Sequence, residues 1–194
     1  MRRLTEEERW TYKKRALAGY EAGSAAYDGL YLEEQERKYR RSLAYLRQRA
    51  GGLLLDCGCG TGMLLAQMLG RSGLLVGVDY SKAMLGLARR RVGMAANVGL
   101  ICGDAECLPF RSGVFDQVVS FTMLGNVPDL PAAIQEMARV GRDSAQILLS
   151  FVKKNIEPDE VLRFLNEEAV SLKEFIDDID LSDWIVIGEK KTRT

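Results

Sequence analysis

The segment that decides the fold is LLLDCGCGTG, residues 53–62. An apolar run ends in an acid and then breaks into glycine at every second position, which predicts a buried parallel strand followed by a tight turn. Gly58, Gly60 and Gly62 can take positive φ and expose bare backbone, so the turn and the start of the next helix can approach a ligand closely. Nucleotide sites of several kinds and ordinary tight turns share this pattern, so its meaning depends on the segments that follow.

Three further apolar runs end in polar residues. LLVGVDYS, residues 74–81, carries Asp79 at its end, and VGLIC, residues 98–102, leads into the acidic turn GDAE, residues 103–106. VFDQVVSF, residues 114–121, follows at a similar distance. In a wound α/β sheet, an acid after the second strand can accept hydrogen bonds from both hydroxyls of a ribose. Four such strand ends on one edge of a sheet predict a ligand crevice that suits a nucleoside.

Helices are expected between these strands, over residues 63–70, 82–91 and 132–140. Ser81 is a good N-cap for the second helix, and Asp129 with Pro131 favours the start of the third. Residues 145–152 are expected to form the fifth strand. Repeated alternation of strand and helix predicts an α/β fold, a three-layer Rossmann-like sandwich with a mainly parallel sheet.

At these positions the chain resembles the class I S-adenosylmethionine-dependent methyltransferases. The matching segments are LDCGCGTG (55–62), GVDYSKAML (77–85), GDAECLPF (103–110) and FDQVV (115–119), which cover about half of the chain. AECLPF (105–110), GNVPD (125–129) and EMARV (136–140) are similar to methyltransferases of the type 11, quinone-biosynthesis group. The resemblance implies a transferase that uses S-adenosyl-L-methionine, releases S-adenosyl-L-homocysteine and methylates an unidentified acceptor by SN2 displacement.

The resemblance also implies donor-binding residues in each strand-end segment. Asp56 and the glycine turn would hold the methionine end, and Asp79 the ribose hydroxyls. Tyr80 and Met84 would flank the adenine, while Asp104 and the backbone of Ala105 would bind its edge. Tyr27 is expected either in a flap over the donor or simply packed. The full predicted set is Tyr27, Asp56, Gly58, Cys59, Gly60, Thr61, Gly62, Asp79, Tyr80, Ser81, Met84, Gly103, Asp104, Ala105, Glu106, Phe121 and Thr122, the last two beside the transferred methyl.

No catalytic residue is predicted, because methyl transfer needs a base only if the acceptor arrives protonated. The fourth-strand exit, SFTM at residues 120–123, lacks the Asn/Asp-Pro-Pro-Tyr/Phe pattern of relatives that methylate adenine amino groups or glutamine amides. Those acceptors are therefore disfavoured. A quinone-like or other metabolite, another RNA site and a protein all stay open as acceptors.

Composition excludes several function classes. Lys+Arg and Asp+Glu both total 27, so no net basic field attracts nucleic acid or anionic lipid. The chain has no histidine, which removes imidazole bases and metal ligands. Cys57, Cys59, Cys102 and Cys107 allow a four-thiolate zinc site, but small packing thiols beside the cofactor are favoured, and no metal is predicted. With no signal peptide and no long apolar span, we expect a cytoplasmic protein.

Residues 1–50 are expected to form a helical cap that serves as the substrate segment, and residues 51–194 the donor-binding domain, in one compact unit. Tyr39, Leu43 and Leu46 recur at helical spacing and should pack on the sheet. Residues 19–28, rich in glycine and alanine, suggest a mobile segment. The outer face of helix 37–49 is basic, which indicates either a solvated surface or a contact for RNA. The cations concerned are Arg37, Lys38, Arg40, Arg41, Arg47 and Arg49.

The tail is expected to form a helix over 159–168, a second helix begun by the capping box SLKE at 171–174, and a strand over 184–188. The resembled family closes its sheet with two further strands, so the C-terminal strand pair is expected to be shortened or to lack one member. A bare sheet edge would then be covered by a partner protein or by a second copy of the chain.

Two alternatives to an active methyltransferase stay open. The short tail suggests a regulatory module that binds S-adenosylmethionine without chemistry. An NAD-dependent oxidoreductase is less favoured, because its Gly-x-Gly-x-x-Gly motif would need the third glycine one place later than Gly62.

Overall fold

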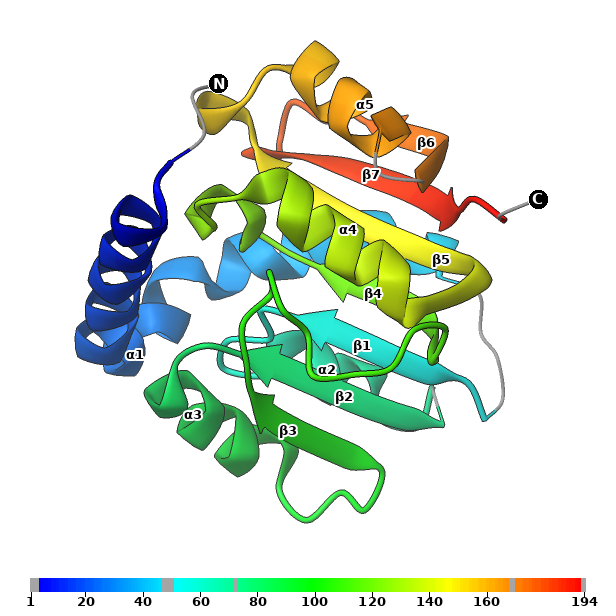
Figure 1. Ribbon diagram of the computed structural model, residues 1–194. Coiled ribbons are helices and arrows are strands. Elements are labelled where there is room, and N and C mark those ends of the chain that lie inside the picture. The colour runs from blue at the N-terminus through cyan, green and yellow to red at the C-terminus, as the bar shows by residue number, and fades with distance from the viewer. Residues whose placement is uncertain (1–3, 47–50, 72, 168–169, 193–194) are drawn as a thin grey trace.

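The computed structural model describes residues 4–46, 51–71, 73–167 and 170–192. They form a seven-stranded sheet in the order β3-β2-β1-β4-β5-β7-β6 (Figure 1). The strands are β1 (Leu53–Cys57), β2 (Leu74–Asp79), β3 (Val98–Cys102), β4 (Phe115–Ser120), β5 (Gly141–Val152), β6 (Val170–Ile176) and β7 (Asp183–Lys190). The α-helices are α1 (Glu6–Ser42), α2 (Met63–Met68), α3 (Lys82–Val92), α4 (Leu130–Val140) and α5 (Pro158–Glu167). Three short 3-10 turns, η1 (Leu43–Tyr45), η2 (Leu124–Asn126) and η3 (Lys153–Asn155), complete the elements.

Strands β1 to β5 are parallel, and β7 runs antiparallel between β5 and β6. The predicted three-layer α/β sandwich with a mainly parallel sheet is confirmed. The strand order reverses between β1 and β4, and ligands of wound α/β sheets bind outside the carboxyl ends of the strands at such a point. In Figure 1 the arrowheads of β2 and β3 point toward α1, so this helix lies at the ligand-binding edge of the sheet.

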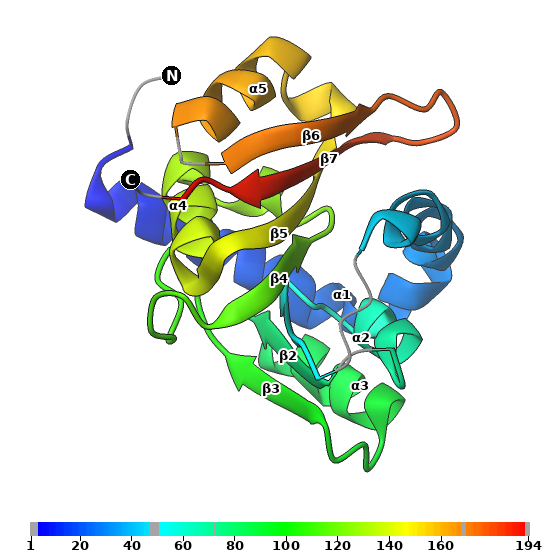
Figure 2. The ribbon, with the colours of Figure 1, turned by 90° about the vertical axis from the view of Figure 1, so that its right-hand side faces the viewer.

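Two apolar layers cover the two faces of the sheet. Alternate residues of the central strands point to opposite sides, so Leu55 packs with α4 and α5 while Leu54 packs with α2 and the end of α1. Figure 2 shows α4 and α5 on one side of the sheet and α2, α3 and the end of α1 on the other. The predicted stripe is confirmed, since Tyr39 and Leu46 are buried in the second layer and Leu43 packs against it.

The short connections start the helices where the sequence predicts them. The Ser81 side chain accepts a hydrogen bond from the Met84 N–H, and Asp129 caps α4 in the same way through Ala132. Gly62 stands at the N-cap of α2 with a φ of 76°, and a Cβ there would lie 3.0 Å from the Cβ of Ala88. This glycine therefore lets α2 pack closely against α3.

Helix α1 is longer than expected. A capping box of Thr5 and Glu8 starts it, and it continues through residues 19–28, so the prediction of a mobile segment there is wrong. Polar contacts hold this stretch in place despite its glycines. The Glu21 carboxylate accepts hydrogen bonds from the Ser81 hydroxyl and the Ala83 N–H, and Asp28 binds Arg91 and Thr61.

The tail contains a full pair of strands, so the prediction of a shortened or missing strand is wrong. The segment 171–174 lies in β6 and does not start a helix. The segment pairs with β7 from Val170 to Ile176, and this pairing outweighs the local capping signal. The helix α5 and the strand β7 agree with the prediction.

The basic face of α1 is also different from the prediction. Lys38 is completely buried, so its assignment to the outer face is wrong. Arg37 pairs with Glu33 and Arg41 with Asp178. Arg47 and Arg49 lie outside the described residues.

Candidate functional site

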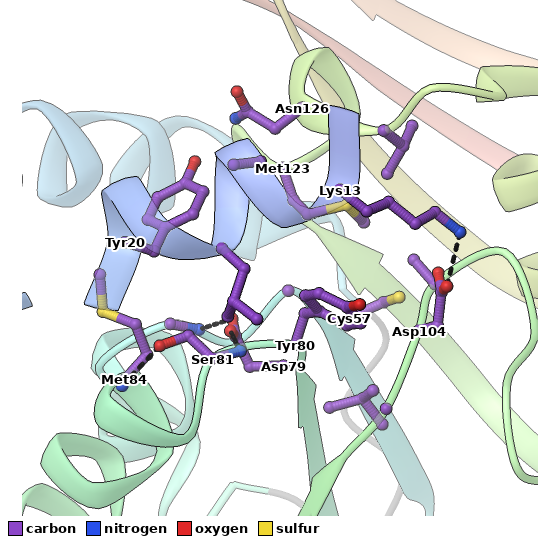
Figure 3. Close-up of a pocket in the computed structure, with 18 of the residues that line it drawn as sticks. Lys13, Tyr20, Cys57, Asp79, Tyr80, Ser81, Met84, Asp104, Met123 and Asn126 are labelled. Carbon is purple, nitrogen blue, oxygen red and sulfur yellow. Dashed lines mark hydrogen bonds and ion pairs between the residues drawn. The ribbon is translucent and has the colours of Figure 1, made fainter. Parts of the chain in front are cut away.

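A cavity opens at the carboxyl ends of β1, β2, β3 and β4, under α1 (Figure 3). It encloses about 820 Å³, its open mouth included. The predicted residues that line it are Tyr27, Gly58, Gly60, Asp79, Tyr80, Ser81, Met84, Gly103, Asp104, Ala105, Phe121 and Thr122. The topology thus brings together the four strand-end segments predicted to form one crevice.

Asp79 at the end of β2 organises one side of the cavity. Its Oδ2 accepts a hydrogen bond from the Gly60 N–H at 2.8 Å and its Oδ1 one from the Ser81 N–H at 2.9 Å. Burial raises the pKa of this carboxyl, and the backbone N–H donors oppose that rise. Each carboxylate oxygen can still accept another hydrogen bond, so Asp79 can bind hydroxyl groups of a ligand.

Gly58 forms the floor of the turn after β1. Its φ is 79°, and a Cβ at this position would lie 2.5 Å from the Cβ and Cγ of Met123. The N–H groups of Gly58 and Cys59 both donate to the carbonyl of Val78, at 2.8 and 3.0 Å. The turn is therefore tied to β2, and only glycine fits its first position without strain.

A smaller chamber of about 320 Å³, open solvent included, adjoins the cavity and has Asp56, Gln35 and Tyr39 in its wall. Cys59 and Thr61 line this chamber and not the larger cavity. Asp56 is 3% exposed, and burial, reinforced by the charge of Asp79, raises its pKa to about 8. Among the residues that the structure describes, no side chain or backbone group forms a hydrogen bond or ion pair with this carboxylate.

The opposite wall carries an ion-pair cluster that joins α1 to the turn after β3. Asp104 binds Lys13 at 2.6 Å, as Figure 3 shows, and its other oxygen accepts from the Glu106 N–H at 2.9 Å. The Glu106 carboxylate lies outside the cavity lining and binds Arg9 and Lys13, both at 2.7 Å. Glu106 therefore anchors α1 and does not face the cavity. Gly62, also predicted to bind the donor, lies outside the linings of both the cavity and the smaller chamber.

Ten of the described residues in the lining were not predicted, and four of them come from α1. Lys13, Leu17 and Tyr20 cover the cavity together with the predicted Tyr27. Figure 3 places Tyr20 near Met84 and Ser81. The spacing of Lys13, Leu17, Tyr20 and Tyr27 follows one helix face, and this periodicity could have revealed them. Met123 and Asn126 line the cavity from the segment after β4.

A buried polar network supports Thr122, a non-glycine residue with a φ of 61°. Its hydroxyl oxygen accepts hydrogen bonds from Gln35 Nε2 and from Lys38 Nζ, both at 2.9 Å. The Lys38 ammonium also binds Asp183 at 2.8 Å and Glu34 at 2.8 Å. This network joins α1, β7 and the end of β4 at the wall of the cavity.

A second, wider space lies beside the cavity, between α1 and the end of β5. It encloses about 1,820 Å³ including open solvent, and Tyr20, Tyr27 and Thr122 belong to both linings. We call this space the outer groove. The outer groove and the cavity therefore adjoin at these shared residues.

The cysteines lie in two environments. Cys57 and Cys59 are buried free thiols whose pKa values burial raises, and Cys102 and Cys107 are exposed free thiols. Over the described ranges, no group of three or more Cys, Asp or Glu side chains is arranged to hold a metal ion. None of the described helices, α1 included, combines the length and apolar character needed to cross a lipid bilayer.

Comparison with known proteins identifies this arrangement. The family model "Methyltransferase domain" matches residues 55–149, the segment that contains the glycine turn, Asp79 and Asp104. The chain belongs to the class I S-adenosylmethionine-dependent methyltransferases. Demethylmenaquinone methyltransferase of Shouchella clausii is 34% identical over 121 residues, which cover 59% of this chain and 52% of that protein. The Bacillus licheniformis enzyme of the same name is 35% identical over 119 residues, 59% of this chain and 51% of that protein. The chain thus spans about half the length of these curated relatives.

Solved structures show the same methyltransferase fold over almost the whole chain. The partner of the Trm112 methyltransferase activator in a Haloferax volcanii complex has a TM-score of 0.81 and 16% identity, covering 92% of this chain and 99% of its own. Magnesium protoporphyrin IX methyltransferase from Synechocystis PCC 6803, solved with bound SAM, has a TM-score of 0.80 and 19% identity, covering 93% and 97%. At these identities the likeness establishes the fold.

Proposed function

We propose that this chain is a methyltransferase that binds S-adenosylmethionine in the cavity and transfers its methyl group to an acceptor in the outer groove. One observation carries the proposal: two carboxyl groups, the buried Asp56 and the half-buried Asp79, flank a glycine turn at the switch point of a methyltransferase fold. Carboxylates can accept hydrogen bonds from an ammonium group and from the two hydroxyls of a ribose. The ligand implied by the family carries both.

The residues fit this donor one by one. We assign the methionine end to the small chamber, where Asp56 and the Oε1 of Gln35 lack partners among the described residues. Asp79 is assigned to the ribose, and Tyr80 with Met84 to the faces of the adenine. Asp104 and Ala105 are assigned to the adenine edge. Helix α1 is assigned as the substrate segment of residues 1–50, above a donor domain of residues 51–194.

When bound, the donor supplies an electrophilic methyl carbon, and transfer forms one bond from the acceptor to that carbon while the carbon–sulfur electron pair goes to sulfur. The chain's contribution is alignment of the two reactants and exclusion of water. Burial raises the pKa of Tyr20 to about 12 and raises that of Tyr27 as well, so both phenols stay protonated. Burial opposes ionisation of Glu34, but hydrogen bonds from Lys38 and Ser182 outweigh it and lower that pKa. None of these groove residues is a good base, so the acceptor is expected to attack as an anion or through a free lone pair.

The proposal also covers the class of acceptor, a protein partner and the location of the protein. The curated relatives are named for demethylmenaquinone, which supports an aromatic metabolite as the acceptor class. A partner protein or second copy at an edge strand, β3 or β6, is supported by the neighbour solved with the Trm112 activator. A reducing, cytoplasmic location agrees with four free cysteines.

The test is transfer of a labelled methyl group. The protein is incubated with methyl-labelled S-adenosylmethionine and fractionated cell extract, with Asp79→Ala as the inactive control. We expect label in one fraction with the unaltered protein and none with the variant. Donor binding without transfer to any fraction would favour the regulatory-module alternative, whereas binding of NAD without binding of the methyl donor would revive the oxidoreductase.

A further inference from the structure

The outer groove has an aromatic wall on α1. Tyr12, Tyr20, Tyr27 and Tyr31 all line it. The rings of Tyr20 and Tyr27 have centroids 6.4 Å apart, and those of Tyr27 and Tyr31 are 4.8 Å apart, so three of them form a continuous row. Tyr31 is 41% exposed although its large aromatic ring is apolar. Such a row offers ring faces on which a planar ligand can stack.

The rim of the groove is positively charged. Arg15 and Lys154 line it as exposed side chains and form no ion pair with any residue in the described ranges. Two other charged groups in the lining are already neutralised. Lys153 binds Asp177 at 2.6 Å, and Glu34 binds Lys38 at 2.8 Å. The charge left over for a ligand is therefore positive and small.

We propose that the outer groove binds the methyl acceptor and that this acceptor is a small planar arene carrying one anionic group. This inference rests on the proposed function, because the groove shares Tyr20, Tyr27 and Thr122 with the cavity assigned to the donor. The arene stacks on the tyrosine row, and its anionic group pairs with Lys154 or Arg15 at the rim. An uncharged quinone would bind only by stacking on the tyrosine row.

The same chemistry occurs in a nucleotide, but the surroundings favour a small molecule. A nucleic acid chain needs a track of free cations along its phosphates. On α1 the buried Lys38 binds Asp183, Arg37 pairs with Glu33, and Arg41 pairs with Asp178. The two free cations of the described groove lining, Arg15 and Lys154, suit one carboxylate or phosphate better than a polymer.

The test compares ligands that differ in one group. Binding of 3,4-dihydroxybenzoate, catechol and adenosine monophosphate is measured by calorimetry on the full chain saturated with S-adenosylhomocysteine. We expect 3,4-dihydroxybenzoate to bind tightest, with its advantage over catechol depending on Lys154. Lys154→Glu should weaken the acid about tenfold and leave catechol unchanged. Lys173→Glu on β6, outside the groove, should change neither.

The aromatic half is tested with a matched pair of tyrosines. Tyr31→Ala should weaken both catechol and the acid about fivefold, whereas Tyr45→Ala should change neither, because Tyr45 is 43% exposed but lies outside the groove. Equal affinities for acid and catechol, or tightest binding of adenosine monophosphate, would overturn the inference. If S-adenosylhomocysteine itself does not bind, the proposed function fails first. If it binds and no arene does, the inference alone fails.

Discussion

The buried ammonium of Lys38 gives a sharp prediction for stability. Lys38 and Asp183 are both 0% exposed and form an ion pair of 2.8 Å. Replacing Lys38 with methionine keeps the volume of the aliphatic stem but leaves Asp183 without its cation in the interior. Breaking a buried pair in this way costs about 3–5 kcal/mol of unfolding free energy. In a chain of this size, each 1 kcal/mol lowers the melting temperature by about 2–4 °C.

The control for Lys38→Met is a second ion pair between α1 and the C-terminal segment. Arg41 binds Asp178 at the same distance of 2.8 Å, but the arginine side chain is 57% exposed. Arg41→Met should cost about 1 kcal/mol or less, because water screens an exposed pair. Urea denaturation of the two variants and the unaltered protein measures the difference directly. Adding Asp183→Asn to Lys38→Met removes the stranded charge and should recover part of the loss.

The reasoning is refuted if Lys38→Met and Arg41→Met lower the unfolding free energy equally. It is also refuted if the double variant Lys38→Met/Asp183→Asn is less stable than Lys38→Met, because the loss would then come from packing and not from an unpaired charge. A thermal melt followed by circular dichroism checks that each variant keeps its secondary structure before unfolding.

The remaining predictions concern the stability of variants at residues that line the cavity and the smaller chamber. Asp56 has a folded-state pKa of about 8 against an ordinary 3.8, so the folded protein favours its protonated form. The stability that this form contributes is complete below about pH 4 and is lost as pH rises through 8. Asp56→Asn should therefore become more stable than the unaltered protein as pH rises from about 4 to 8, by at most ~1.4 kcal/mol per pH unit; a pH-independent difference would contradict this. Gly58→Ala should cost about 1–3 kcal/mol more than Gly60→Ala, since both have positive φ but only Gly58 abuts Met123; equal losses in denaturant melts would rule this out. Ser81→Ala should lower the unfolding free energy by about 1 kcal/mol through loss of the α3 cap, and no measurable loss would show that the cap is dispensable.

Much of the donor half of the molecule could be predicted from local sequence. The glycine turn, the acids at 79 and 104 and the cap at Ser81 depend on backbone geometry and on strand ends, which short patterns specify well. The mainly parallel α/β fold and the grouping of these residues in one cavity followed from them.

The errors arose where distant contacts override local signals. The SLKE sequence at 171–174 has the form of a capping box, but pairing with β7 makes it a strand. Lys38 belongs by pattern to a basic surface, yet Asp183, 145 residues later, holds it in the interior. Residues 19–28 contain helix-weakening glycines, and contacts of Glu21 and Asp28 with α2 and α3 segments keep the helix continuous. Local patterns carry no information about such partners.

The most direct test of the central claim is calorimetric titration of the full chain with S-adenosylmethionine. We predict saturable binding of one donor per chain. Asp79→Ala should weaken that binding by at least about tenfold, because a charged acceptor of the ribose hydroxyls is lost, while Asp159→Ala on the exposed start of α5 should leave it unchanged. Absence of heat with the folded protein, or an unchanged affinity for Asp79→Ala, would contradict the assignment of this cavity to the methyl donor.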